Sequence, residues 1–224
     1  MPVITMSRQI GSGSRELAQR LCEELGLSAF DKRLMVQVAS EVGLSAQEIV
    51  DYSEMEYERR GFFDTLFRRS RSVAEFPMWI GSPDIGYEKR SRILDEYGAI
   101  QLVRATIQAA YERGNVLIIG RGGQAILEYK PEVLHIRVVA PFEARLERLQ
   151  EQQDLTPAQA RRFLREHDEA SAEYLGTFYH IDPDDATLYH IVVNTGRFDM
   201  DGVLQLVKQS LELMSEPSEQ PTDR

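Results

Sequence analysis

Cysteine is almost absent from this chain, and its scarcity limits where and how the protein is stabilised. The 224 residues contain one cysteine, Cys22, so no intramolecular disulfide can form. A chain without disulfides is typical of a reducing compartment, and we therefore expect a cytoplasmic protein. Cys22 falls within a predicted amphipathic helix, where we interpret it as a core residue.

Long apolar runs are missing as well. No stretch approaches the roughly 20 consecutive apolar residues that a membrane-spanning helix requires. The chain enters a strand pattern at Val3 without a basic and apolar leader before it. We therefore expect no secretory signal and no membrane partner.

Basic residues are fewer than acidic ones. The chain has 26 Lys and Arg against 36 Asp and Glu, which gives a net charge of −10. Such a protein repels polyanions, so we expect no nucleic-acid partner, although a small anion can still bind where basic side chains gather. The four histidines have no metal-ligand spacing, and we predict no metal site built from side chains.

A glycine-rich loop near the start of the chain is the strongest functional signal. An apolar run at Val3–Met6 leads to Gly11-Ser12-Gly13-Ser14, and an amphipathic helix pattern begins at Arg15. Glycines let backbone N–H groups point at an anion, and a helix N-terminus adds positive potential. The loop resembles the P-loop pattern G-x-x-x-x-G-K-[S/T], but Ser14 stands at the Lys position and Arg8 at the first glycine. A tight turn without a ligand is the alternative.

Strand patterns alternate with helical patterns along most of the chain. Three polar or glycine-rich segments, at 11–14, 120–123 and 194–195, follow predicted strands. Because the carboxyl ends of parallel strands meet at one edge of a sheet, we expect these segments to converge. The pattern predicts a three-layer α/β/α domain with a parallel sheet over 1–214 and a disordered tail at 215–224. Strands are expected at 3–6, 116–119, 134–139 and 191–193, and helices at 15–25, 32–42, 100–113, 141–150, from 156, and 203–213.

Two segments differ from this alternation. Residues 51–97 mix arginines and aromatic residues with prolines and glycines, and we predict a mostly helical inserted lobe with an irregular loop. Residues 152–182 form a helical, Arg-rich segment in which Arg161 and Arg165 share a helix face at i,i+4 spacing. We predict that the second segment is a lid. A solvated surface is the alternative in both cases.

Four segments in order resemble the cytidylate kinase-like family, a branch of the P-loop nucleoside monophosphate kinases. They lie at 7–16, 30–32, 118–123 and 184–195. Members of that branch often lack the P-loop Lys, so the resemblance makes its absence a family trait. It implies a P-loop kinase fold in which 51–97 binds the acceptor. It also implies phosphorylation of a nucleoside monophosphate such as CMP or dCMP, with ATP and Mg²⁺ as cofactors.

The resemblance also implies roles for particular residues. A transferred phosphoryl group spreads negative charge over its oxygens, and arginines can balance that charge. The expected catalytic residues are Arg15, Arg161 and Arg165. The expected cofactor-binding residues are Arg8, Gly11, Ser12, Gly13, Ser14, Asn194 and Thr195. The expected substrate-binding residues are Asp31, Arg121 and Asp168.

Departures from the family pattern keep other functions open. Ile119 and Gly122 replace two acids beside Arg121, and Glu169–Ser171 stand where related families carry a further Arg. Arg145 and Arg148 either face the nucleotide or form a surface of ion pairs. The alternatives are a nucleotide-binding or regulatory protein without useful catalysis, and a kinase of a small non-nucleotide metabolite. The oligomeric state is open, with a homodimer as one option.

Overall fold

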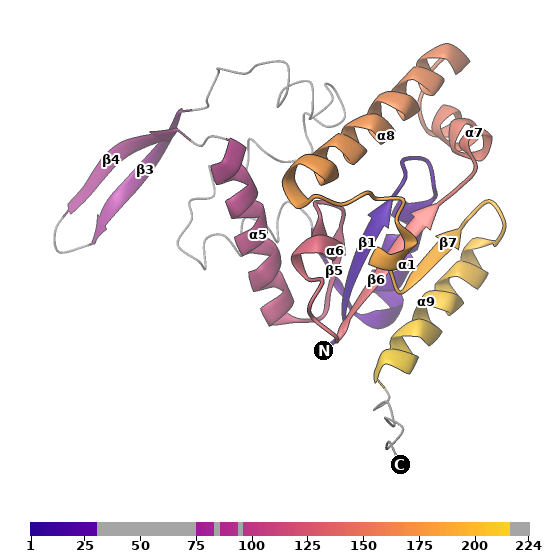
Figure 1. Ribbon diagram of the computed structural model, residues 1–224, viewed down its shortest axis with the longest axis horizontal. Helices are drawn as coiled ribbons and strands as arrows, with labels where there is room; N and C mark the ends of the chain where they lie inside the picture. Colours follow the sequence, from indigo (N-terminus) through magenta and orange to yellow (C-terminus); the bar gives the residue numbers. More distant parts are fainter. Residues whose placement is uncertain (31–74, 83–85, 94–95, 216–224) are drawn as a thin grey trace. The chain divides into compact units, whose positions relative to one another are not determined.

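The chain divides into two compact units, one built from Met1–Ala29 and Gly114–Arg224 and the other from Phe30–Arg113. The computed structural model describes residues 1–30, 75–82, 86–93 and 96–215 (Figure 1). The glycine-rich loop and the segments expected to meet it all belong to the first unit.

A five-stranded parallel sheet forms the centre of the first unit. Its strand order is β2-β5-β1-β6-β7, and each neighbouring pair is parallel. The strands are β1 (Val3–Arg8), β2 (Ser28–Ala29), β5 (Val116–Ile119), β6 (Val133–Val139) and β7 (Ile191–Asn194). This arrangement confirms the predicted α/β fold.

Helices cover both faces of this sheet, which gives three layers (Figure 1). On one face, Ile4 and Met6 of β1 are buried in a core that includes Leu17 of α1 and Val203 of α9. On the other face, α6 packs against β1, where a Cβ placed at Gly123 would lie 3.4 Å from Thr5. The helices of this unit are α1 (Ser14–Leu25), α6 (Gly123–Ile126), α7 (Phe142–Gln152), α8 (Pro157–Tyr179), the 3₁₀ turn η1 (Ala186–Leu188) and α9 (Met200–Ser215).

The two faces of the sheet differ in polarity because side chains alternate along a strand. Ile4 and Met6 point to the apolar core, whereas Thr5 and Ser7 point to the opposite face. There the Thr5 hydroxyl lies 2.6 Å from Nδ1 of His135, and Arg137 donates to Oγ of Ser7 at 2.9 Å. The α6 face of the sheet therefore holds a buried polar stripe that leads to the carboxyl ends of β1 and β6.

The second unit contains a hairpin where the sequence predicts helix and irregular loop. Strands β3 (Glu75–Ser82) and β4 (Gly86–Ile93) pair antiparallel, from Glu75 opposite Ile93 to Ser82 opposite Gly86. The prediction of a mostly helical lobe is therefore wrong over 75–82 and 86–93, where aromatic and β-branched residues favour strands and Pro77 disfavours a helix. Helix α5 (Glu96–Arg113) follows. The remaining expectations for 32–42 and 51–74 lie outside the described residues. So does the tail predicted at 215–224, except Ser215, which is the last residue of α9 and not part of a tail.

No helix among the described residues is long and apolar enough to cross a membrane.

Candidate active site

The glycine-rich loop joins β1 to α1 at the point where the connections of the sheet diverge. From β1 the chain continues toward β2, and from the neighbouring strand β6 it continues toward β7. Ligands of open α/β sheets bind beyond the strand ends at such a point. The segments after β1, β5 and β7 meet at this edge, as the sequence predicts (Figure 1).

Left-handed glycines shape the loop. Gly11 has φ +77° and Gly13 has φ +75°, and a Cβ added at Gly11 would lie 2.7 Å from the carbonyl oxygen of Arg145. Gly13 is the N-cap of α1 and provides no side-chain cap for it. The N–H groups of the first turn have no intrahelical partner, so the loop ends at an uncapped helix N-terminus that suits an anion.

Three side chains hold the carbonyl groups of this loop. Arg145 donates to the Ile10 carbonyl at 3.3 Å, and Arg148 donates to the Gly11 carbonyl at 3.3 Å. The hydroxyl of Thr195 donates to the Ser12 carbonyl at 2.7 Å. In a trans peptide the N–H points away from the C=O. The N–H groups of Gly11 and Gly13 therefore point away from the carbonyls of Ile10 and Ser12, whereas the Ser12 N–H donates to the Gln9 carbonyl at 3.2 Å.

The structure thus places Thr195 against the glycine-rich loop. Its backbone N–H donates to the Val139 carbonyl at 3.0 Å. Its neighbour Asn194 instead accepts a hydrogen bond from the Gly196 N–H at 2.9 Å. Within the loop, Oγ of Ser12 is buried without a hydrogen-bond partner among the described residues. A phosphate oxygen is a ligand group that could satisfy such a hydroxyl.

Asp168 on α8 forms a two-point ion pair with Arg145. The distances are 2.9 Å from Nη1 to Oδ1 and 2.7 Å from Nη2 to Oδ2. The Arg145 side chain is 4% exposed and that of Asp168 is 36% exposed, and two parallel hydrogen bonds make such a pair strong. Both carboxylate oxygens are engaged, so a substrate that contacts Asp168 would have to compete with Arg145.

The arginines of α8 differ in their partners. Arg161 and Arg165 each lie 6.0 Å from the ring centre of Phe142, so they share a face as their spacing predicts. Arg161 forms a two-point pair with Glu143 at 2.9 Å for both contacts, whereas Arg165 has no carboxylate partner in the described part of the chain.

Two further arginines lie at the two ends of the segment that contains the loop. Arg8 ends β1, Arg15 lies in the first turn of α1, and neither forms an ion pair within the described ranges. Burial lowers the pKa of His167 on α8, and the Arg8 guanidinium lowers it further against the opposing effect of Asp168. Arg8 therefore lies near the stretch of α8 that contacts the loop.

Arg121 lies in a strained turn at the end of β5. Gly120, Arg121 and Gly122 have φ of +69°, +58° and +73°, three successive left-handed residues. A non-glycine residue in this conformation is uncommon and costly, and such residues are enriched at functional sites. Tyr179 at the end of α8 donates its hydroxyl hydrogen bond to the Arg121 carbonyl at 3.3 Å. The Gly120 N–H donates to the Met6 carbonyl at 2.9 Å, which anchors the turn to β1.

Arg137 is a site residue that sequence reasoning missed. Its guanidinium is buried and pairs with the exposed carboxylate of Asp184, and it also donates to Ser7. The Tyr189 hydroxyl completes the group with contacts to Ser7 at 3.3 Å and to the Pro183 carbonyl at 3.0 Å. A basic residue inside the apolar run of β6 was the signal available in the sequence.

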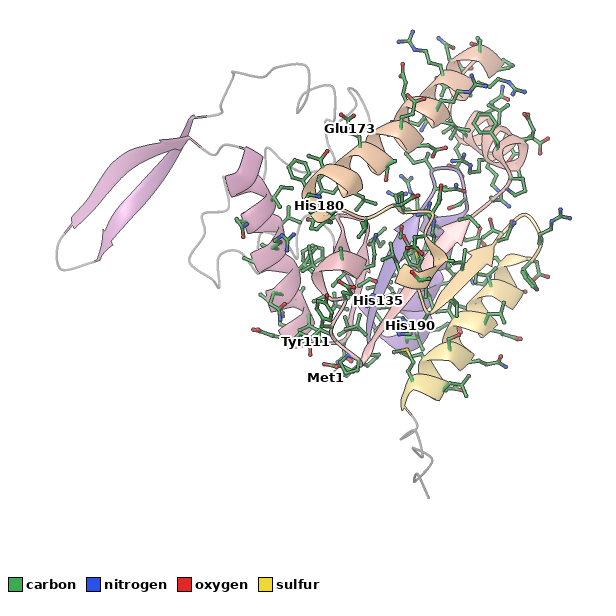
Figure 2. All side chains as sticks on the ribbon, viewed as in Figure 1. Met1, Tyr111, His135, Glu173, His180 and His190 are labelled. Atoms are coloured by element: carbon green, nitrogen blue, oxygen red, sulfur yellow. The ribbon has the colours of Figure 1, made fainter. Side chains whose placement is uncertain are left out.

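The polar stripe continues away from the strand ends to a pair of histidines. The rings of His135 and His190 stack with centres 5.2 Å apart (Figure 2). The backbone N–H of His135 donates to the ring nitrogen Nδ1 of His190 at 2.9 Å. Burial, helped by His190, lowers the pKa of His135 to about 4. His135 is therefore neutral near pH 7.

One expected substrate-binding residue is not tested by the structure, because Asp31 lies outside the described residues. In the part of the chain that the structure describes, no three His, Cys, Asp or Glu residues gather closely enough to hold a metal ion.

A parallel sheet of this strand order has the fold of the P-loop kinase class. The glycine-rich loop between β1 and the uncapped N-terminus of α1 lies where that class has its phosphate-binding loop. Residues 3–197 match the cytidylate kinase-like family, and the chain belongs to that family. The resemblance read from the four sequence segments is thereby confirmed. Family and fold together support a function of the nucleotide-kinase type.

Individual relatives cover nearly the whole chain. A cytidylate kinase of Methanopyrus kandleri is 24% identical over 96% of this chain and 95% of its own length. A cytidylate kinase of Pyrococcus horikoshii is 26% identical over 94% of this chain and 88% of its own length. The crystal structure of a protein from Eubacterium ventriosum shares the fold, with a TM-score of 0.62 and 16% identity over 95% of this chain and 99% of that one.

Proposed function

We propose that the protein transfers a phosphoryl group from ATP to a nucleoside monophosphate, with CMP or dCMP as the first acceptors to test. The observation that carries the proposal is the uncapped N-terminus of α1 at Gly13, in a loop whose carbonyl groups are held by Arg145, Arg148 and Thr195. Relatives named cytidylate kinases over nearly the full chain support the choice of acceptor.

The phosphates of ATP would bind at Gly11–Ser14. Backbone N–H groups and the helix N-terminus supply partial positive charge there, and the buried Ser12 hydroxyl would gain a partner. Thr195 shapes this loop from the end of β7, and Asn194 lies beside it. We assign both to the donor site.

Arginine side chains would supply the charge that phosphoryl transfer requires. The reaction depends on positioning and on neutralising the charge of the transferred group rather than on covalent chemistry from the protein. Arg8, Arg15 and Arg165 are suited to this role because none has a carboxylate partner among the described residues. Arg161 would reach a phosphate only by leaving Glu143, so we rank Arg165 above it.

Mg²⁺ would enter with the nucleotide. Its ligands are oxygens, and it commonly keeps several waters while it binds substrate phosphates. The described residues offer no metal-binding cluster of their own. When bound, the ion would neutralise charge on the phosphates that the glycine-rich loop holds.

Arg121 is the residue that we assign to the acceptor. A guanidinium presents two parallel N–H donors that match a phosphate. Its turn follows β5, the strand beside β1, so it lies at the same edge of the sheet as the donor loop.

An assay of the full-length protein tests the proposal. ADP formation from ATP and Mg²⁺ is measured with CMP, dCMP, UMP, AMP and GMP, each at high enzyme concentration. We expect turnover with CMP or dCMP, and ATP should raise the melting temperature by an amount that follows from RT ln(1 + [L]/Kd). Absence of turnover with all five acceptors contradicts the proposal.

A second function is favoured by one observation. Glu169–Ser171 stand where related families carry a further Arg. A protein that binds ATP without transferring its phosphate would fit this loss. The same experiments separate the two, because this candidate shifts the melting temperature and gives no turnover.

A further inference from the structure

Helix α8 contacts both loops of the candidate active site through one of its faces. Asp168 and Tyr179 are eleven positions apart on α8, which is about three helical turns and roughly 16 Å along the axis. Residues three turns apart lie on the same face. Buried residues between and before them, including Leu164, Tyr174 and Leu175, mark that side of the helix as the packed one.

The first contact reaches the glycine-rich loop. Asp168 holds the guanidinium of Arg145 at both oxygens, and the same guanidinium donates to the Ile10 carbonyl. The backbone of Arg145 also approaches the loop so closely that a Cβ at Gly11 would collide with it. A change in the position of Asp168 would therefore be passed to the donor loop through a single buried side chain.

The second contact reaches the turn that carries Arg121. Tyr179 donates to the Arg121 carbonyl, and its ring lies over Gly122, where a Cβ would come within 2.5 Å of a ring carbon. The ring thus occupies the space that only a glycine leaves open. This contact helps to keep Arg121 in its left-handed conformation, which is unfavourable for a non-glycine residue.

The helix between these contacts is well defined at both ends. A capping box formed by Thr156 and Gln159 begins it. His180, labelled at the other end of the helix in Figure 2, ends it in a left-handed conformation. A continuous helix of 23 residues can transmit a displacement along its axis, because its backbone hydrogen bonds resist local stretching.

We infer that Asp168 and Tyr179 are positioning residues and that α8 is a strut that holds the donor loop and the Arg121 turn in register. The strut makes binding at one site strengthen binding at the other. This inference rests on the proposed function, which names the donor loop and Arg121 as the two substrate sites. Neither positioning residue needs to touch a substrate, because each acts through Arg145 or Arg121.

Binding measured separately at the two sites tests this inference. Calorimetry gives the affinity for CMP with and without MgADP, and the reciprocal affinity for MgADP must change by the same factor. In the wild type we expect MgADP to tighten CMP binding by roughly fivefold or more, a typical size for coupled sites. In Asp168→Asn and in Tyr179→Phe we expect that factor to fall below about two.

Steady-state kinetics adds a readout that general destabilisation would not give. Asp168→Asn removes the charge that pairs with Arg145 and holds the donor loop. It should therefore raise KM for ATP about tenfold, which corresponds to about 1.4 kcal/mol. Tyr179→Phe should raise KM for CMP and leave KM for ATP nearly unchanged. Asp168→Glu, which keeps the charge, should recover part of the ATP effect.

Matched controls exist on the same protein. Glu166 pairs with Arg162 at i,i+4 on the exposed side of α8, so Glu166→Gln removes a charge two residues from Asp168 without touching the loop. Tyr129 is 88% exposed, so Tyr129→Phe removes a hydroxyl that plays no part in the strut. Both controls should keep the wild-type coupling.

The outcomes separate the inference from the proposed function. A wild-type protein that binds neither MgADP nor CMP overturns both. A wild type that binds and couples the two ligands, with variants that couple them equally well, overturns the strut alone. If Asp168→Asn does not fold, Arg145→Lys repeats the donor-end test, because it keeps the charge and loses the two-point geometry.

Discussion

Arg148 donates two hydrogen bonds to Thr195, one to the side-chain Oγ1 at 2.9 Å and one to the backbone carbonyl at 2.8 Å. Thr195 in turn donates to the Ser12 carbonyl. A residue that follows β7 therefore holds the loop that follows β1, and an arginine that follows β6 contacts both of them. The donor site is assembled by the ends of three strands that are distant in the sequence.

Replacing Thr195 by valine tests this assembly. Valine keeps the shape of the side chain and removes the hydroxyl, which leaves a donor of Arg148 and the Ser12 carbonyl without their partner. We expect a loss of about 1–3 kcal/mol in the free energy of unfolding, the usual cost of unpaired buried polar groups. Urea denaturation measures it, and calorimetry should show weaker binding of ATP.

Thr187 provides the matched control. Its hydroxyl donates to Asp185 at 2.6 Å in an exposed turn, so solvent can replace the lost contact in Thr187→Val. We expect a change below about 0.5 kcal/mol, as for other surface substitutions. Equal losses in the free energy of unfolding would show that the hydrogen bonds of Thr195 at the loop stabilise the protein no more than an exposed hydrogen bond does.

Gly11→Ala and Gly26→Ala form a second matched pair. Both glycines have positive φ, at +77° and +64°, but only Gly11 faces a close neighbour, the carbonyl oxygen of Arg145 at 2.7 Å from an added Cβ. Gly26→Ala should cost about 1–2 kcal/mol from conformation alone. Gly11→Ala adds a steric clash, so it should cost clearly more and also abolish ATP binding. Similar urea midpoints for the two variants would contradict the tight approach of Arg145.

The parallel sheet could be predicted because its signals are local. The run 116–119 is short and wholly apolar, as in strands buried on both faces, and Gly120 follows it. The run 134–139 is mostly apolar, with His135 and Arg137 inside it, and Pro141 follows shortly after its end. The order of loops after strands then places 11–14, 120–123 and 194–195 at one edge. The structure confirms those strands to within two residues at each end.

The hairpin at 75–93 could not be read in the same way. Its residues show no clear alternation of apolar and polar types, and Pro77 and Gly81 suggested an irregular loop. Cross-strand pairing such as that of Phe76 with Arg92 depends on register, which local patterns do not encode.

The partners of the site arginines could not be predicted from the sequence either. Arg145 meets Asp168 across 23 positions and Tyr179 meets Arg121 across 58. The sequence shows that these residue types are present near strand ends. Only tertiary packing decides that Asp168 is engaged by Arg145, whereas Arg165 has no acidic partner among the described residues.

Arg165→Ala should slow phosphoryl transfer. Removing a cation that stabilises transition-state charge typically costs about 100-fold or more in kcat. Arg162→Ala is the control, because Arg162 is 80% exposed and pairs only with Glu166 nearby, and its kcat should stay within about twofold of the wild type. ADP formation at saturating ATP and CMP gives both values. A kcat unchanged in Arg165→Ala would remove that residue from the catalytic assignment.

The buried histidine beside Thr5 makes a pH-dependent contribution to stability. Burial lowers the pKa of His135 to about 4, below the usual value of about 6.5 for an unfolded chain. As pH falls below 6.5 the unfolded state therefore binds a proton that the folded state does not, and stability decreases until the pH reaches about 4. Between pH 7 and pH 5 this effect alone should remove about 2 kcal/mol from the free energy of unfolding.

His135→Gln isolates this contribution from the carboxylates that titrate in the same range. The variant will be less stable than the wild type at pH 7, because it loses the fit of the imidazole between Thr5 and His190. Its stability should nevertheless fall less steeply toward pH 5, since the titrating group is gone. Urea denaturation of both proteins at pH 7, 6 and 5 gives the two slopes. Parallel slopes would mean that His135 takes up its proton equally readily in the folded and unfolded states, contrary to its burial against β1.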